Sequence, residues 1–176
     1  KLLTIDPHIH RYKSLKDIFT IPAKYVTANT LIADYIEKYF KNEIIIGPDW
    51  ESYQWAEKIA KRINVQATVL KKERFSSRHV EVKMVNPIDI KGKNVVIVDD
   101  IISTGNTMIK AAKAAKKLGA RSFSAIGVHG LFVENGYEKM KKAGFNKIIT
   151  TNCIGHKTNK IDVSSLIITE LKREKK

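Results

Sequence analysis

Two adjacent carboxylates and a run of small hydroxyl-bearing residues are the side chains in this sequence best suited to chemistry. Asp99 and Asp100 follow directly after the β-branched run 95–98, and residues 103–107 read Ser-Thr-Gly-Asn-Thr. The chain then continues with apolar residues at helical spacing. A small loop that opens a helix offers backbone N–H groups and the positive end of the helix dipole to an anion. The segment therefore predicts a phosphate-binding turn at the end of a buried strand.

Each residue of this loop can contribute to holding a phosphate. The hydroxyl groups of Ser103, Thr104 and Thr107 are further hydrogen-bond donors. Gly105 allows the backbone to approach the ligand closely, because it has no Cβ. Asn106 tolerates a positive φ better than most other non-glycine residues, so it is compatible with a tight turn.

The two carboxylates would repel a phosphate unless they bind something neutral or cationic beside it. Ribose hydroxyls meet this condition, and so does a metal ion that bridges to further phosphates. A simpler interpretation is that one Asp and one hydroxyl only cap the helix. That interpretation leaves the rest of the run unexplained. We therefore expect Asp99 and Asp100 to face a phosphorylated ribose at the carboxyl end of a parallel strand.

Short β-rich runs alternate with longer helical ones along the whole chain. This pattern is typical of an α/β domain with a mainly parallel sheet flanked by helices. Asn29 is predicted to cap the first helix, Gly119 suits the left-handed position after a later one, and the charged stretch 71–79 matches neither period. No repeat or linker divides residues 1–176, which predicts a single domain. The predicted strands are 2–5, 43–46, 67–70, 80–84, 94–98, 122–128 and 147–151, and the predicted helices are 30–40, 52–63, 107–118, 134–143 and 163–171.

The composition limits the classes of function. A net charge of +14 and an isoelectric point near 9.8 would suit nucleic-acid binding. The lysines are scattered along predicted helix faces, however, and no helix-turn-helix pattern, Cys/His zinc spacing or aromatic RNA-binding strand is present. We therefore expect a solvated basic surface around a site for small anions, and no nucleic-acid partner. No apolar run approaches the roughly 20 residues that span a bilayer, so no membrane association is expected.

Two features concern the setting of the chain. Cys153 is the lone cysteine, so no internal disulfide can form, and a cytoplasmic setting is the simplest inference. The sequence opens at Lys1 without a methionine and directly in the apolar run 2–5. We therefore expect the chain to be part of a longer protein.

The run 95–107 resembles the motif with which phosphoribosyltransferases bind 5-phosphoribosyl diphosphate (PRPP). That motif has four apolar residues, two aspartates and a loop containing Thr-Gly, and Asn106 stands where many members have a second glycine. The resemblance implies a type I phosphoribosyltransferase-like, Rossmann-like fold. It also implies that 103–107 hold a 5-phosphate while Asp99 and Asp100 bind the ribose 2- and 3-hydroxyls.

Further segments are similar to ribose-phosphate diphosphokinases, the branch of this superfamily that makes PRPP from ribose 5-phosphate and ATP. The similar segments follow in the family's order and cover nearly the whole chain. They are residues 3–8 with 19–22, 46–49, 72–74, 128–130 and 161–163.

This second resemblance implies roles for four more residues. His8 and Asp49 would ligate Mg²⁺ together with ATP oxygens, while Lys72 and Arg74, on a mobile charged loop, would close over the transferring group as catalytic residues. Plainer interpretations are a structural loop histidine, a turn-initiating aspartate and a surface charge run. The resemblance also implies a homo-oligomer, and it makes this chain the second half of a two-domain synthetase, with only part of the ATP site.

Departures from the family pattern leave alternatives open. Residues 50–52 read Trp-Glu-Ser where the family has Gly-Gly, and 151–153 read Thr-Asn-Cys where it often has Thr-Asp-Thr. One alternative is a base-salvage phosphoribosyltransferase, although no separate hood segment for a nucleobase is visible. Another is a PRPP-sensing regulator that binds nucleic acid through its basic surface.

Overall fold

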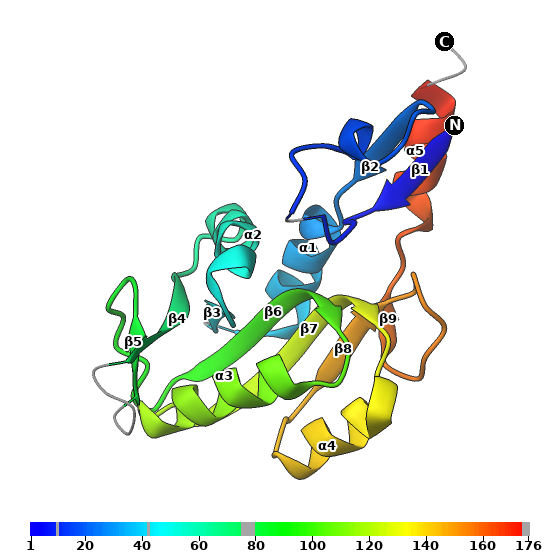
Figure 1. Cartoon of the computed structure of the whole chain (residues 1–176). Helices are drawn as coiled ribbons and strands as arrows, with labels where there is room; N and C mark the ends of the chain where they lie inside the picture. Colours follow the sequence, from blue (N-terminus) through cyan, green and yellow to red (C-terminus); the bar gives the residue numbers. More distant parts are fainter. Residues whose placement is uncertain (10, 42, 75–79, 174–176) are drawn as a thin grey trace.

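The computed structural model describes residues 1–9, 11–41, 43–74 and 80–173, and its centre is a twisted sheet of seven strands in the order β5-β4-β3-β6-β7-β8-β9 (Figure 1). All neighbouring strands run parallel except β4 and β5, which form an antiparallel hairpin. The predicted mainly parallel sheet flanked by helices is therefore confirmed. The sheet strands are β3 (Ile44–Gly47), β4 (Ala67–Arg74), β5 (Val80–Met84), β6 (Asn94–Ile102), β7 (Ser122–Gly130), β8 (Ile148–Thr151) and β9 (Asn159–Ile161).

Helices cover both faces of this sheet, and alternate residues of β6 point to opposite faces. Val96 and Val98 pack in one cluster with the helices α1 (Asn29–Tyr39) and α2 (Trp50–Arg62). Val95 and Ile97 pack in the other cluster, with α3 (Asn106–Lys117) and α4 (Gly136–Lys142). A strand buried on both faces carries a continuous apolar run, as 95–98 does, because neither side meets water. This packing fixes where β6 ends.

A separate arm lies beside the main sheet. It consists of the parallel strands β1 (Leu2–Ile5) and β2 (Ala23–Val26), a short 3-10 helix η1 (Leu15–Asp17), and the last helix, α5 (Ser164–Arg173) (Figure 1). Lys24 on β2 pairs with the buried carboxylate of Glu170 on α5. This pair thereby joins β2 to the last helix of the chain.

Several element ends differ from the prediction. β6 and β7 each continue two or more residues further, because their ladder extends to the pair Ile102–Gly130. β4 likewise continues to Arg74, because it pairs with β5. β2 and β9 were not predicted, since both are short, partly exposed and paired with strands distant in sequence or irregular in register.

The capping prediction for Asn29 is wrong. Ala28 occupies the N-cap position of α1 and makes no side-chain bond there. The carboxylate of Asp6 accepts the Ala28 N–H instead, at 2.6 Å, so the cap comes from the end of β1. Gly119, at φ 94°, does adopt the predicted left-handed conformation after α3. Within the described residues, no helix combines the length and apolar character that crossing a membrane requires.

Candidate active site

The carboxylates of Asp99 and Asp100 lie on β6 itself and not in a loop after it. Asp99 pairs in register with Gly127 of β7, and the ladder continues to Ile102. The loop that was predicted from Asp99 therefore begins only at Ser103. Asp99 is 9% exposed, and the side chain of Asp100 is 26% exposed. The rigid central strand therefore fixes the backbone that carries both carboxylates.

A tight turn links β6 to α3 and forms the predicted phosphate loop. Gly105 is the N-cap of α3 at φ 75°, a left-handed conformation that costs glycine little. Asn106 is the first residue of the helix, so α3 begins one residue before the predicted start at Thr107, and the positive φ of the turn belongs to Gly105 and not to Asn106. The N–H of Asn106 donates to the hydroxyl of Thr104 at 3.4 Å. The first turn of α3 leaves its leading amides at the loop, as anion binding requires.

His8 reaches the end of β6 from the segment that follows β1. Its Nδ1 lies 2.7 Å from Oδ2 of Asp100. The backbone before it is held by His129 on β7, whose Nε2 lies 3.0 Å from the carbonyl oxygen of Ile5 and 3.1 Å from that of Asp6. Since carbonyl oxygens only accept, Nε2 of His129 carries the proton. Asp6 itself adopts a left-handed conformation with φ 35°.

Asp49 has a local structural role at the start of α2. Its side chain caps α2, where Oδ1 accepts from the Ser52 N–H at 3.0 Å and from the Ser52 hydroxyl at 2.8 Å. Residues 50–52, which depart from the family's Gly-Gly, form the first turn of this helix. Asp49 caps the helix and also belongs to the site, because the residue lines the cavity formed by these segments.

These segments meet around one polar cavity of about 520 Å³. Five of the predicted site residues line it, and they come from four different places in the chain. The five are His8, Asp49, Asp99, Asp100 and Thr107. The convergence of His8, Asp49 and the Asp pair was expected only from resemblance, and the cavity brings them together. Ser103, Thr104, Gly105 and Asn106 lie in the adjoining turn, outside the cavity lining.

The sequence interpretation missed several residues of this cavity. Asp6 is the one that the sequence could have indicated. It follows β1 directly, as Asp99 follows the apolar run of β6, and it stands immediately before Pro7 and His8. The aromatic residues gave no comparable signal, since their spacing fits core packing equally well. The additional polar and aromatic lining residues are Asp6, Tyr12, Lys13, Tyr25, Glu51, Ser52 and Trp55.

Burial dominates the electrostatics of the site. Burial, together with the smaller effect of the nearby carboxylates of Asp100 and Asp49, raises the pKa of Asp99 to about 8. Burial also raises the pKa of Asp6, against the opposing effect of its hydrogen bond from Ala28. At neutral pH Asp99 is therefore largely protonated, and a protonated carboxyl can donate a hydrogen bond as well as accept one. A cluster of this kind is typical of a functional site.

The donor set fits a magnesium ion that is held mainly by substrate and water. Among the described residues, no three His, Cys, Asp or Glu side chains form a ready-made metal cluster. Mg²⁺ is commonly bound through one or two carboxylates plus phosphate oxygens. Asp49 could supply such a carboxylate from the cavity wall. His8, whose nitrogen is a less usual magnesium ligand, is held against Asp100.

Lys72 and Arg74 belong to the β4–β5 hairpin. Their backbones pair with Val82 and Val80, so these positions form a strand and not the charged loop that was expected. Their side chains lie outside what the structure describes, as do residues 75–79. Their catalytic role therefore stays a prediction.

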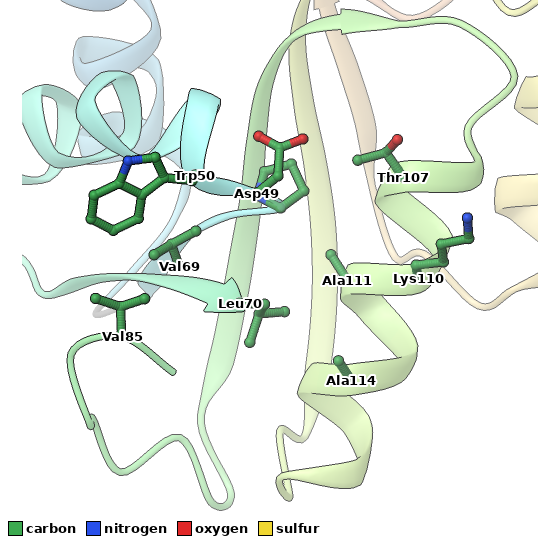
Figure 2. Close-up of a pocket in the computed structure, with 10 residues that line it drawn as sticks. Asp49, Trp50, Val69, Leu70, Val85, Thr107, Lys110, Ala111 and Ala114 are labelled. Carbon is green, nitrogen blue, oxygen red and sulfur yellow. The ribbon is translucent and has the colours of Figure 1, made fainter. Parts of the chain in front are cut away.

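A second, mainly apolar cavity of about 690 Å³ adjoins the first (Figure 2). Asp49 and Thr107 border both cavities. Figure 2 shows Val69, Leu70 and Val85 on one side of it, and Ala111 and Ala114 of α3 on the other. Trp50, which is 62% exposed and stacks on Tyr53 at 5.5 Å between ring centroids, stands at its edge. The sequence interpretation gave no indication of this cavity.

The fold and the arrangement of the site are those of the phosphoribosyl transferase domain class. The chain belongs to the phosphoribosyl transferase domain family, whose model matches residues 14–166. Within that family it is similar to ribose-phosphate pyrophosphokinases. It is 37% identical to the enzyme of Pyrococcus abyssi over 160 residues, which are 91% of this chain and 55% of the relative. It is 34% identical to the enzyme of Sulfolobus acidocaldarius over 174 residues, which are 97% of this chain and 59% of the relative.

Solved structures agree with this family assignment at the level of the fold. The phosphoribosylpyrophosphate synthetase of Mycobacterium smegmatis superposes with a TM-score of 0.78 at 20% identity, over 97% of this chain and 57% of that one. The adenine phosphoribosyltransferase of Thermoanaerobacter pseudethanolicus gives a TM-score of 0.57 at 22% identity, over 70% of this chain and 76% of that one. The chain thus spans somewhat more than half the length of the curated relatives it matches.

Proposed function

We propose that this chain is the ribose 5-phosphate-binding part of a ribose-phosphate diphosphokinase, which transfers diphosphate from ATP to C1 of ribose 5-phosphate. One observation carries the proposal. His8, Asp49 and the pair Asp99–Asp100 line a single cavity beside the phosphate loop, although they come from separate segments. Curated relatives at 37% identity, which are named ribose-phosphate pyrophosphokinase, support the same proposal.

The sugar phosphate would bind at the end of β6 and the start of α3. The leading amides of α3 and the hydroxyls of Ser103, Thr104 and Thr107 would hold the 5-phosphate. Asp100 would accept from a ribose hydroxyl, and Asp99, with a pKa near 8, can either donate to a hydroxyl or accept from one. Two fixed carboxylates would thus orient O1 of the ribose towards the diphosphate donor. Positioning of this kind supplies much of the catalysis of such a transfer.

ATP would approach from the His8 side of the cavity. Mg²⁺, when bound with ATP, would neutralise phosphate oxygens, and Asp49 and His8 are the residues of this chain that would hold it. Lys72 and Arg74 would neutralise charge on the transferring diphosphate. Removal of one such contact typically costs about 3 kcal/mol of transition-state stabilisation.

The arm supports the proposal that a second domain completes the enzyme. An isolated two-stranded sheet is marginal in water, because three or more strands or a covering helix are needed for stability. The arm of β1, β2 and α5 nevertheless exposes large apolar side chains, namely Ile18, Phe19, Ile21, Tyr25, Ile168 and Leu171. Over 40% of the length of each of these relatives lies outside the part that this chain matches. We infer that the arm packs against a first domain that supplies the rest of the ATP site, within a homo-oligomer.

Two measurements test the proposed function. Isothermal titration of the chain with ribose 5-phosphate is expected to show binding that Asp99→Ala and Asp100→Ala weaken at least tenfold. Adding ATP and Mg²⁺ to the chain together with its complementary domain is expected to release AMP only when ribose 5-phosphate is present. Base-dependent release of diphosphate from PRPP would instead indicate a salvage transferase. Salt-sensitive binding to RNA that Asp99→Ala leaves unchanged would indicate a regulator.

A further inference from the structure

The first turn of α4 packs directly against the phosphate loop at Gly136. A Cβ placed on Gly136 would lie 2.6 Å from the carbonyl oxygen of Ser103, a distance that real Cβ atoms essentially never show, and 3.1 Å from the carbonyl oxygen of Thr104, which is tighter than most real contacts. Gly136 has helical angles, φ −53° and ψ −41°. Its conformation is therefore open to any residue, and only its contact with the loop requires the missing side chain.

The loop in turn packs against α4 at Gly105. A Cβ there would lie 2.8 Å from Cγ and 3.0 Å from Sδ of Met140, and 3.2 Å from the carbonyl oxygen of Gly136. Met140 is fully buried. Each of the two segments thus presents a glycine to the other, and the space between them holds the Met140 side chain and no more.

A strained connection brings α4 to this place. The N–H groups of Leu131 and Phe132 both donate to the carbonyl oxygen of Ile102, at 3.0 and 3.1 Å, so the chain after β7 is tied to the last residue of β6. Phe132, Glu134 and Asn135 then adopt left-handed conformations with φ between 48° and 59°. Such conformations in non-glycine residues persist only where the surroundings impose them. Because of them α4 begins at Gly136, two residues later than predicted.

We propose that Gly136 and Met140 are positioning residues that set the shape of the phosphate loop and thereby its affinity for the 5-phosphate. The inference rests on the proposed function in one respect, that the loop binds a sugar phosphate. Neither residue lines the polar cavity, so both act through the backbone of Ser103, Thr104 and Gly105. A helix start at this position does not need glycine, and Ala is the better helix former by about 1 kcal/mol within a helix.

Gly136→Ala is the most direct test, with Gly155→Ala as the matched control. Gly155 has open space around it and no left-handed φ, so a methyl group there meets nothing. Ribose 5-phosphate is titrated calorimetrically into the wild-type chain and both variants, and thermal unfolding is recorded for each. Gly136→Ala is expected to weaken binding at least tenfold and to shift the amide resonances of Gly105 and Asn106 in the free protein. Gly155→Ala is expected to bind within twofold of the wild type.

The outcomes separate this inference from the proposed function. A wild-type chain that fails to bind ribose 5-phosphate contradicts the function. A wild-type chain that binds it, with Gly136→Ala binding within twofold, overturns the positioning role. Should Gly136→Ala fail to fold, Met140→Leu conserves the core volume while placing a branched carbon against Gly105. It is expected to weaken binding at least threefold, and unchanged affinity would overturn the inference in the same way.

Discussion

His8 Nδ1 lies 2.7 Å from Asp100 Oδ2, although 92 positions separate the two residues in the chain. The contact joins the segment after β1 to the end of β6, and so it joins the arm to the main sheet at the polar cavity. In the proposed mechanism one partner faces ATP and the other the ribose. The pair is therefore where the two substrates would meet.

Asp100→Asn is expected to weaken ribose 5-phosphate binding at least tenfold, because a charged acceptor for a sugar hydroxyl is lost. His8→Ala is expected to leave that binding within threefold and to lower AMP formation in the presence of ATP. Calorimetry and an AMP assay provide the two readings. Asp34→Asn is the control, since Asp34 forms an exposed ion pair with Arg62 and neither residue lines the cavity. Equal losses for Asp100→Asn and Asp34→Asn would contradict the assignment.

Asp49 combines a structural and a proposed catalytic role, and two substitutions separate them. Asp49→Ala removes the cap of α2 and is expected to destabilise the fold by about 1 kcal/mol. Asp49→Ser retains a capping hydroxyl, so it is expected to unfold within about 0.5 kcal/mol of the wild type. Both are expected to lower Mg²⁺-dependent AMP formation. Full activity in Asp49→Ser would show that the residue only caps the helix.

The raised pKa of Asp99 predicts how the stability of the fold depends on pH. Its pKa is raised to about 8 in the folded chain from the ordinary value of 3.8, so the folded state binds the proton more tightly than the unfolded state. The resulting stabilisation is complete below about pH 4 and is lost as the pH rises towards 8. Asp99→Asn removes this loss. Between pH 5 and 8 the wild type is expected to lose stability relative to Asp99→Asn by on the order of 1 kcal/mol per pH unit, measured by urea unfolding. Parallel curves for the two proteins would contradict the raised pKa.

The arm depends on a partly buried ion pair. The side chain of Glu170 is 4% exposed and pairs with Lys24 on β2 and, at 3.7 Å, with Arg173. Lys24→Met would leave the buried carboxylate with less compensation, at a cost of about 1–3 kcal/mol. Amide hydrogen exchange is expected to rise in α5 and β2 and to stay unchanged in α3. Exchange that rises equally in all three would show that the arm does not open on its own.

The sequence alone predicted those features that depend on local pattern. The apolar run 95–98 and the loop after it indicated both the central strand and the phosphate-binding turn, because burial on both faces and a glycine before a helix leave clear local signals. The seven-residue helix α4 was placed only approximately, since its start is set by contact with the loop and by left-handed residues that no local preference predicts.

Features set by distant contacts could not be predicted in the same way. Asp6, 22 positions earlier in the chain, accepts the N–H of Ala28 at the start of α1, whereas a local capping rule assigned the cap to Asn29. The apolar cavity under Trp50 arises between β4 and α3, whose residues have ordinary core spacing. Family resemblance, and not spacing, brought His8 and Asp49 into the predicted site.

The central claim is that the start of α3 holds the 5-phosphate while the end of β6 holds the sugar. Amide chemical shifts recorded during titration with ribose 5-phosphate test it most directly. The largest changes are expected at Thr104, Gly105, Asn106 and Thr107, with smaller ones at Asp99 and Asp100. Shifts confined to the apolar cavity around Val69 and Ala114, with residues 103–107 unaffected, would contradict the claim.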